Sequence, residues 1–184
     1  RLSIVADNPQ DLCAKVDSVL KKGFSAKFSL PTGVHFSSQA KAEGKIAFLF
    51  PGQGAQYIGM GSELAQHFPL AKEAWEEAKR IDFGTEWLHD VVYPVPVFSD
   101  KERKEQQVHL TKTQWAQPAI GVTSLSMLNL VREMGVEADY CAGHSYGELT
   151  ALYYAGYYST QDFLRISQKR GELMNEAAKT SGSM

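Results

Sequence analysis

The sequence Gly-His-Ser-Tyr-Gly at residues 143–147 is the feature that most constrains how this chain folds. A short apolar stretch precedes it at 140–142, and a helix-prone stretch follows it at 148–152. Gly-x-Ser-x-Gly between a strand and a helix is the pattern of a nucleophile elbow, a sharp turn that exposes a serine hydroxyl. We therefore predict that Ser145 lies between a strand and a helix as a candidate nucleophile.

The residues on either side of Ser145 are expected to support its role. Gly143 and Gly147 let the backbone turn tightly and keep Cβ atoms away from the hydroxyl. His144 adjoins Ser145 on a turn so tight that the two side chains diverge, so we expect it to support the turn and not to deprotonate the serine. Free N–H groups at the start of the following helix point to where an oxyanion would form. The alternative is a glycine-rich turn with no catalytic role.

Composition and charge exclude several classes of protein. The 184 residues are 43% hydrophobic, which supports a sizeable core and argues against disorder. The net charge of −2 gives no electrostatic footprint for nucleic acid or an anionic membrane, and the apolar stretches are too short to span a bilayer. Cys13 and Cys141 do not make a disulfide framework, and the 5 histidines show no metal-ligand spacing. We expect a cytoplasmic protein that binds no metal, nucleic acid or membrane.

Residues 1–44 are predicted to form a small α/β unit. Asn8 and Gly23 have the character of the N-cap and the C-cap of a helix. Three strands are expected beside that helix, at 2–6, 24–30 and 34–37. The polar residues 37–44 then form a connector into a second domain.

Residues 45–184 alternate between strand and helix patterns, which indicates a parallel α/β sheet. The apolar run at 45–50 predicts a strand buried on both faces, and it ends at Pro51. Helices are expected at 57–67, 69–81, 117–134 and 159–178. Pro118 is expected in the first turn of the third of these helices, and the mixed-charge run at 101–105 is expected to be a solvated surface segment.

A second glycine-rich loop, Pro-Gly-Gln-Gly at 51–54, follows the first strand of this part. Loops at the carboxyl ends of parallel strands gather at one edge of a sheet, where ligands bind. Gln53, between two glycines, is therefore expected to aim its backbone N–H at an oxyanion beside Ser145, and the N–H of Tyr146 is the second expected donor. Losing one such donor costs about 3 kcal/mol. The alternative is a glycine-rich turn that binds no ligand.

Three segments in this order resemble one family of enzymes. They are Phe-Pro-Gly-Gln-Gly-Ala-Gln at 50–56, Thr-Gln-Trp-Ala-Gln-Pro-Ala at 113–119 and Gly-His-Ser-Tyr-Gly-Glu at 143–148. The chain resembles the malonyl-CoA:acyl-carrier-protein transacylases, including the acyltransferase domains of polyketide and fatty-acid synthases. The resemblance covers residues 45–184 and implies a parallel-sheet, hydrolase-like large subdomain. Residues 1–44 resemble the small linker domain that joins a ketosynthase to an acyltransferase.

The resemblance implies a ping-pong transfer with malonyl-CoA as the donor. Ser145 would be acylated by the CoA thioester and deacylated by the phosphopantetheine thiol of an acyl carrier protein, with no cofactor bound. Gln53 and the backbone of Tyr146 would form the oxyanion hole. Arg170 matches the arginine that binds the free carboxylate of the malonyl group, because a planar guanidinium suits a carboxylate bidentately. An acyl carrier protein and an adjacent ketosynthase domain are the implied partners.

The resemblance also places part of the family's machinery beyond Met184. The base of the family is a histidine well downstream of the nucleophile, and no histidine of this chain matches it. We expect that histidine, the small subdomain and the segment that distinguishes malonyl from methylmalonyl groups to lie beyond Met184, so that residues 1–184 alone are an incomplete catalyst.

Tyr146 departs from the aliphatic residue or glutamine that is usual after the serine in this family. We expect its side chain to border the acyl pocket. An aromatic residue there is similar to the acyltransferases of polyunsaturated-fatty-acid synthases and of some iterative polyketide synthases.

Two other functions share parts of the pattern. A serine esterase of the α/β-hydrolase type also has Gly-x-Ser-x-Gly, but it needs an Asp and a His after the nucleophile and predicts no carboxylate-binding arginine. A non-catalytic docking module derived from an acyltransferase is the second alternative. Intact Ser145, Gln53 and Arg170 argue against it, whereas the missing base favours it.

Overall fold

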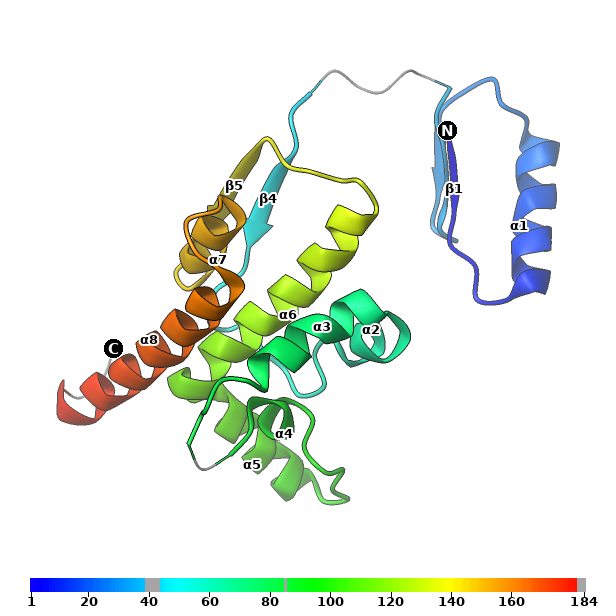
Figure 1. The fold of residues 1–184 in the computed structure, drawn as a ribbon. Coiled ribbons are helices and arrows are strands. Elements are labelled where there is room, and N and C mark those ends of the chain that lie inside the picture. Colours follow the sequence, from blue (N-terminus) through cyan, green and yellow to red (C-terminus); the bar gives the residue numbers. More distant parts are fainter. Residues whose placement is uncertain (39–43, 85, 182–184) are drawn as a thin grey trace. The chain divides into compact units, whose positions relative to one another are not determined.

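The computed structural model describes residues 1–38, 44–84 and 86–181. The chain divides into two compact units, Arg1–Gly44 and Lys45–Met184, and each has its own sheet (Figure 1). Most of the connector predicted at 37–44 lies outside the described residues.

The first unit contains, in its described part, a three-stranded antiparallel sheet and one helix. The strands are β1 (Leu2–Ile4), β2 (Phe28–Leu30) and β3 (Val34–Phe36), in the order β1-β3-β2. Helix α1 (Pro9–Lys22) ends at Gly23, so the predicted C-cap is confirmed. The φ of Gly23 is 79°, a positive value that glycine adopts without steric cost. The Lys22 ammonium lies 5.3 Å from the centre of the Phe28 ring and joins the end of α1 to β2.

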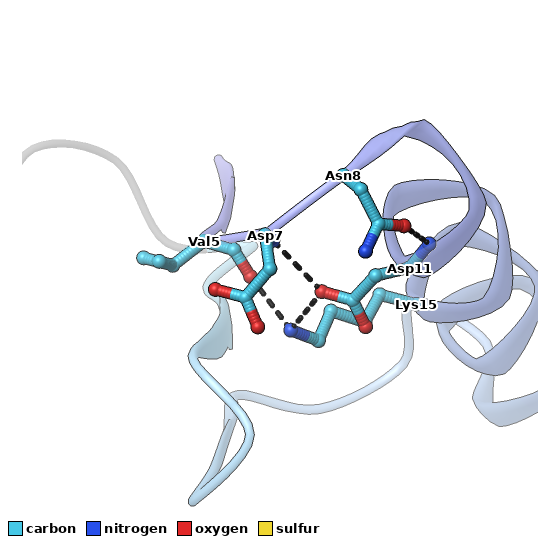
Figure 2. A network of polar contacts seen from close by, with 5 residues as sticks. All are labelled: Val5, Asp7, Asn8, Asp11 and Lys15. Atoms are coloured by element: carbon cyan, nitrogen blue, oxygen red, sulfur yellow. Dashed lines mark hydrogen bonds and ion pairs between the residues drawn. The ribbon is translucent and has the colours of Figure 1, made fainter.

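Hydrogen bonds tie the start of α1 to the end of β1 (Figure 2). The side chain of Asn8 accepts from the N–H of Asp11 at 2.9 Å, as predicted for an N-cap. The Asp11 carboxylate accepts from Lys15 at 2.6 Å and from the N–H of Asp7 at 3.1 Å. Lys15 also donates to the carbonyl of Val5 at 2.9 Å. The hydrogen bond from Lys15 holds the pKa of Asp11 below its usual value.

Replacing Asn8 with alanine is expected to loosen the first turn of α1. The substitution leaves the N–H of Asp11 without its acceptor, and losing such a cap costs about 1 kcal/mol, or about fivefold in hydrogen-exchange protection. Exchange of the α1 amides in the full chain measures this effect. Asn8→Ser keeps an acceptor and is the matched control. Equal protection in the alanine and serine variants would contradict the prediction.

The second unit is built on a parallel pair of strands. β4 (Ala47–Phe50) pairs with β5 (Tyr140–Gly143), with Phe50 opposite Gly143, so both strands end at the same edge. Among the described residues of this unit, seven helices accompany the strands: α2 (Ser62–His67), α3 (Pro69–Ala78), α4 (Leu88–Val92), α5 (Asp100–Thr111), α6 (Thr113–Glu133), α7 (Gly147–Tyr154) and α8 (Thr160–Ser181). This arrangement confirms the predicted α/β class with a parallel sheet.

The apolar core of this unit lies mainly between helices. α6 is buried along most of its length and packs against both α3 and α8 (Figure 1). Trp75 from α3, Trp115 and Leu125 from α6 and Phe163 from α8 contribute to one buried cluster. Because α6 and α8 both join this cluster, their relative position is fixed by close packing.

Two helices begin at other residues than predicted, and two more were not predicted. α6 begins at Thr113, four residues earlier than predicted, so Pro118 lies inside the helix and not in its first turn. α2 begins only at Ser62, because Gly59 and Gly61 take positive φ values of 81° and 71° and the preceding chain forms turns. α4 was not predicted. The run at 101–105 is exposed as predicted, yet it belongs to α5, which was not predicted either.

Candidate active site

The turn after β5 has the geometry of a nucleophile elbow. β5 ends at Gly143, α7 begins at Gly147, and the exposed Ser145 lies on the turn between them. Its φ is 54°, and among the residues described it is the one non-glycine with a positive φ. A left-handed backbone costs a residue with a side chain about 1–2 kcal/mol. Such strain persists only where the surroundings hold it, as at catalytic turns.

Backbone packed on backbone holds the elbow. The N–H of Gly147 donates to the carbonyl of His144 at 2.9 Å, and the N–H of His144 donates to the carbonyl of Phe50 at 3.1 Å. A Cβ at Gly147 would overlap the Phe50 carbonyl group, and a Cβ at Gly143 would overlap the carbonyl of Gly147. Glycine is therefore required at both positions, because the elbow approaches the end of β4 at Gly147 and folds back on its own backbone at Gly143, without room for a side chain.

The loop after β4 packs against the elbow. A Cβ at Gly52 would overlap the carbonyl oxygen of His144, and the Nδ1 of His144 lies 3.1 Å from that position. The next residue, Gln53, donates through its side chain to the Oγ1 of Thr113 at the start of α6, at 3.2 Å. The two glycine-rich segments thus lie together at the carboxyl edge of the sheet, where ligands bind in parallel α/β folds.

Two backbone donors at this edge are free. Within the part of the chain that the structure describes, the N–H groups of Gln53 and Tyr146 donate no hydrogen bond. Tyr146 is adjacent to Ser145, and Gln53 follows the glycine that contacts the elbow. Unpaired N–H groups at a strained turn can stabilise a negative oxygen.

Arg170 on α8 has a buried partner that leaves part of its guanidinium available. Its Nη1 donates to the Oε1 of Gln117 on α6 at 2.6 Å, and the Gln117 side chain is buried, with 1% of its surface exposed. Arg170 itself is half-buried. No ion pair among the described residues includes Arg170, whereas the neighbouring Lys169 pairs with Glu172 at 3.4 Å.

Gln117 also contacts the loop after β4. Its Nε2 lies 3.4 Å from the Oε1 of Gln53 and 3.3 Å from the sulfur of Met174. One buried amide thus joins Arg170 to the loop that carries the candidate oxyanion donor. Sequence reasoning gave Gln117 no role, although a glutamine beside Pro118 in an otherwise buried helix segment was the available signal.

The side chain of Tyr146 lies in the core, so the expectation that it borders an acyl pocket is wrong. It has no exposed surface, and its hydroxyl lies 2.7 Å from the Oγ of Ser167 on α8. A Cβ at Gly121 on α6 would overlap that hydroxyl. The phenol therefore fills a space between α6 and α8 that an aliphatic residue would leave without a polar contact. Burial raises the pKa of the Tyr146 phenol well above its usual value, so the group stays neutral.

Two of the other histidines have side-chain partners of their own. His35 lies 2.7 Å from the Oγ of Ser29 in the first unit, and His109 lies 2.8 Å from Glu86. No hydrogen bond among the described residues joins a histidine side chain to Ser145. The same residues contain no group of three or more His, Cys, Asp or Glu side chains arranged to hold a metal. No helix among them has the length and apolar character that a membrane span needs.

Known proteins match the chain over the unit that carries this site. Residues 47–184 match the family model described as "Acyl transferase domain". The malonyl CoA-acyl carrier protein transacylase of Bacillus subtilis is 44% identical over 133 residues, which are 72% of this chain and 38% of that protein.

Solved structures agree with this match. The acyltransferase domain from the second module of the salinomycin polyketide synthase superposes with a TM-score of 0.75 at 31% identity, over 95% of this chain and 37% of that one. A malonyl transacylase in complex with a type II polyketide acyl carrier protein superposes with a TM-score of 0.60 at 33% identity, over 73% of this chain and 40% of that one.

The chain thus spans about two-fifths of the length of these relatives. The family model matches three-quarters of the residues of this chain. The matched part contains the parallel strands and the elbow. On these grounds the chain belongs to the acyl transferase domain family.

Proposed function

We propose that this chain carries the nucleophile, the oxyanion donors and the carboxylate-binding arginine of an acyltransferase that moves a malonyl group from CoA to an acyl carrier protein. The observation that carries the proposal is Arg170. It is a half-buried guanidinium without a carboxylate partner among the described residues, and it lies on α8, in the same unit as the strained elbow of Ser145. An esterase has no use for such a group, whereas a malonyl donor presents a free carboxylate.

The proposed reaction proceeds through an ester of Ser145. The serine Oγ attacks the thioester carbonyl of malonyl-CoA, its proton passes to a base, and the N–H groups of Gln53 and Tyr146 bind the resulting oxyanion. Collapse of this intermediate breaks the C–S bond, and CoA leaves as the thiol after taking up the proton. The phosphopantetheine thiol then attacks the seryl ester, and the serine hydroxyl is regenerated.

We assign the base to a histidine in the part of the acyltransferase domain that this chain does not span. Two observations support that assignment. The described histidine side chains form no hydrogen bond with Ser145, and the chain covers 38% of the Bacillus subtilis relative. General-base catalysis requires a group within hydrogen-bond reach of the serine proton.

The proposed partners are an acyl carrier protein and a ketosynthase domain. One matching structure is, by its title, a malonyl transacylase with its acyl carrier protein. The match to a polyketide synthase acyltransferase domain covers 95% of this chain and so extends into residues 1–44. We therefore propose that residues 1–44 are the linker domain that joins a ketosynthase to the acyltransferase. The CoA donor points to a reaction in the cytoplasm.

The position of the covalent intermediate tests this function. The polypeptide that carries this chain is incubated with labelled malonyl-CoA, quenched in acid and mapped by mass spectrometry. We expect one malonyl group, attached to the peptide that contains Ser145, and none in Ser145→Ala. Addition of phosphopantetheinylated acyl carrier protein should move the label to the carrier.

Two outcomes would reject the proposal. The first is a malonyl adduct on another residue with Ser145→Ala still active. The second is rapid hydrolysis of simple aryl esters with no transfer to the carrier, which would identify an esterase. Tyr157→Phe, which changes an exposed residue after α7, is a control that should leave the label in place.

A further inference from the structure

The residue after the nucleophile has a second role in this chain. We propose that Tyr146 is a positioning residue, which sets the separation between Ser145 and Arg170 through its buried hydrogen bond to Ser167 and its fit against Gly121. The inference rests on the proposed function, because it concerns how the site selects an acyl group with a carboxylate. The residue acts through its side chain, separately from the oxyanion role of its backbone N–H.

The direction of the buried hydrogen bond follows from counting protons. The hydroxyl of Ser167 donates to the carbonyl of Phe163 at 2.7 Å, which uses its only proton. Tyr146 must therefore donate to the Oγ of Ser167 across their 2.7 Å separation. Both side chains have no exposed surface, so water cannot replace either partner when one is lost.

Gly121 provides the space for the phenol. A Cβ at this position would overlap the Tyr146 hydroxyl and would lie 3.2 Å from the Cζ of Tyr146 and 3.1 Å from the Cζ of Phe163. Any larger residue at position 121 would displace the tyrosine. α6 therefore contacts the elbow residue directly at this point, without an intervening side chain.

One turn of each helix connects this contact to Arg170. Ser167 precedes Arg170 by three residues on α8, and Gln117 precedes Gly121 by four on α6, so each pair is about one helical turn apart. Gln117 and Arg170 are themselves joined at 2.6 Å. Tyr146 contacts Gly121 and Ser167 at one end of these two helical turns. At the other end, Gln117 and Arg170 are hydrogen-bonded to each other.

A second glycine keeps the two helices close beside Arg170. A Cβ at Gly171 on α8 would lie 2.8 Å from the carbonyl oxygen of Thr113 and 3.0 Å from the Cα of Gln114. Asn175 adds a hydrogen bond to Gln114 at 2.6 Å. Because the two helices are in close contact here, backbone packing resists a shift of α6 relative to α8.

These contacts control a distance that the substrate must span. A malonyl group has to reach Ser145 with its thioester carbon and Arg170 with its carboxylate at the same time. The backbone of Ser145 is strained, so it keeps its position only while its neighbours hold it. A misplacement of about 1 Å can cost 100-fold in rate. An acetyl group has no carboxylate, so its transfer is insensitive to this separation.

Tyr146→Phe and Ser167→Ala test the inference in the polypeptide that carries this chain. The readout is kcat/KM for malonyl and for acetyl transfer to the carrier protein. Each variant should lower the malonyl-to-acetyl preference about fivefold to tenfold, mainly through a higher KM for malonyl-CoA. The double variant should be no lower than either single variant, because both remove the same bond.

Tyr153→Phe is the matched control. Tyr153 lies on α7, and its hydroxyl is 3.2 Å from the Oγ1 of Thr160 at the start of α8, so the same atom is removed from a similar contact. This variant should keep the wild-type preference. An equal loss in Tyr153→Phe, or an unchanged preference in Tyr146→Phe, would overturn the inference.

A suppression experiment examines the fit at Gly121 independently of activity. Gly121→Ala should lower the midpoint of thermal unfolding, and adding Tyr146→Phe should recover part of that loss by removing the overlapping hydroxyl. A double variant less stable than Gly121→Ala alone would contradict the described contact.

Arg170→Ala separates failure of this inference from failure of the proposed function. If Arg170→Ala leaves the malonyl preference unchanged, the proposed function itself is wrong, and the positioning role is rejected with it. If Arg170→Ala removes the preference while Tyr146→Phe retains it, the proposed function stands and only the positioning role of Tyr146 fails.

Discussion

Gly147→Ala is expected to destabilise the second unit by about 3 kcal/mol or more and to reduce formation of the acyl-enzyme by about 100-fold. The added Cβ would overlap the carbonyl group of Phe50 and the carbonyl oxygen of Pro51. Both are backbone atoms, so no side chain can rotate to relieve the overlap. The start of α7 would have to move away from the end of β4 and carry Ser145 with it.

Chemical denaturation, followed by tryptophan fluorescence, measures the loss of stability, because all 3 tryptophans lie in the second unit. Gly44→Ala is the control, since a Cβ there would meet no atom within 4 Å. It should leave both the unfolding midpoint and the acylation rate unchanged. A Gly147→Ala variant as stable as Gly44→Ala would contradict the prediction, because it would show that the elbow has space for a Cβ at position 147.

Arg170→Ala is expected to lower malonyl transfer by about 100-fold or more and to leave acetyl transfer within a few-fold of wild type. The guanidinium offers a carboxylate charge-assisted, bidentate hydrogen bonds in a half-buried position, where such bonds are strong. Acetyl-CoA presents no carboxylate, so it gains nothing from the arginine. Arg170→Lys should recover only part of the loss, because an ammonium cannot copy the planar fork.

Competition between labelled malonyl-CoA and acetyl-CoA for Ser145 measures the ratio directly. Arg165→Ala is the matched control, since Arg165 is an exposed cation on the same helix. It should leave the ratio unchanged. An equal loss of malonyl and acetyl transfer in Arg170→Ala would instead indicate that Arg170 stabilises the fold through Gln117.

Local signals predicted the parts of this structure that depend on neighbouring residues. Asn8 caps the start of α1 and Gly23 caps its end as expected, because both act within one turn of the backbone. Ser159, where the last helix is expected to begin, accepts from the N–H of Asp162 at 3.1 Å, as a capping serine does. The strand–turn–helix around Ser145 is equally local, since its two glycines and its short apolar strand are contiguous in sequence.

The elements that were missed depend on other forces. α5 has only one buried residue, Leu110, so it lacks the apolar stripe by which a helix is recognised. Pro118 lies inside α6 at the loss of one helical hydrogen bond, in a buried turn whose Gln117 side chain accepts a hydrogen bond from Arg170 on α8. A sequence pattern gives no warning of either, because the compensation comes from distant residues.

The same distinction applies to the site. Ser145, Gln53 and Arg170 could be singled out from the sequence, because each lies in a segment that resembles the family. The contacts of Tyr146 with Gly121 and Ser167 join residues 25 and 21 positions away, and only the packing of α6 on α8 brings them together. Side chains whose partners are chosen by tertiary packing have no local signature.

The left-handed backbone of Ser145 also makes this serine a reporter of the folded state. Its φ of 54° exists only while β4, β5 and α7 are packed together, and the unfolded chain relaxes to ordinary angles. The strained turn and the native fold are therefore gained and lost together. Titration of Ser145 with a serine-directed acylating reagent would accordingly count correctly folded molecules in a preparation.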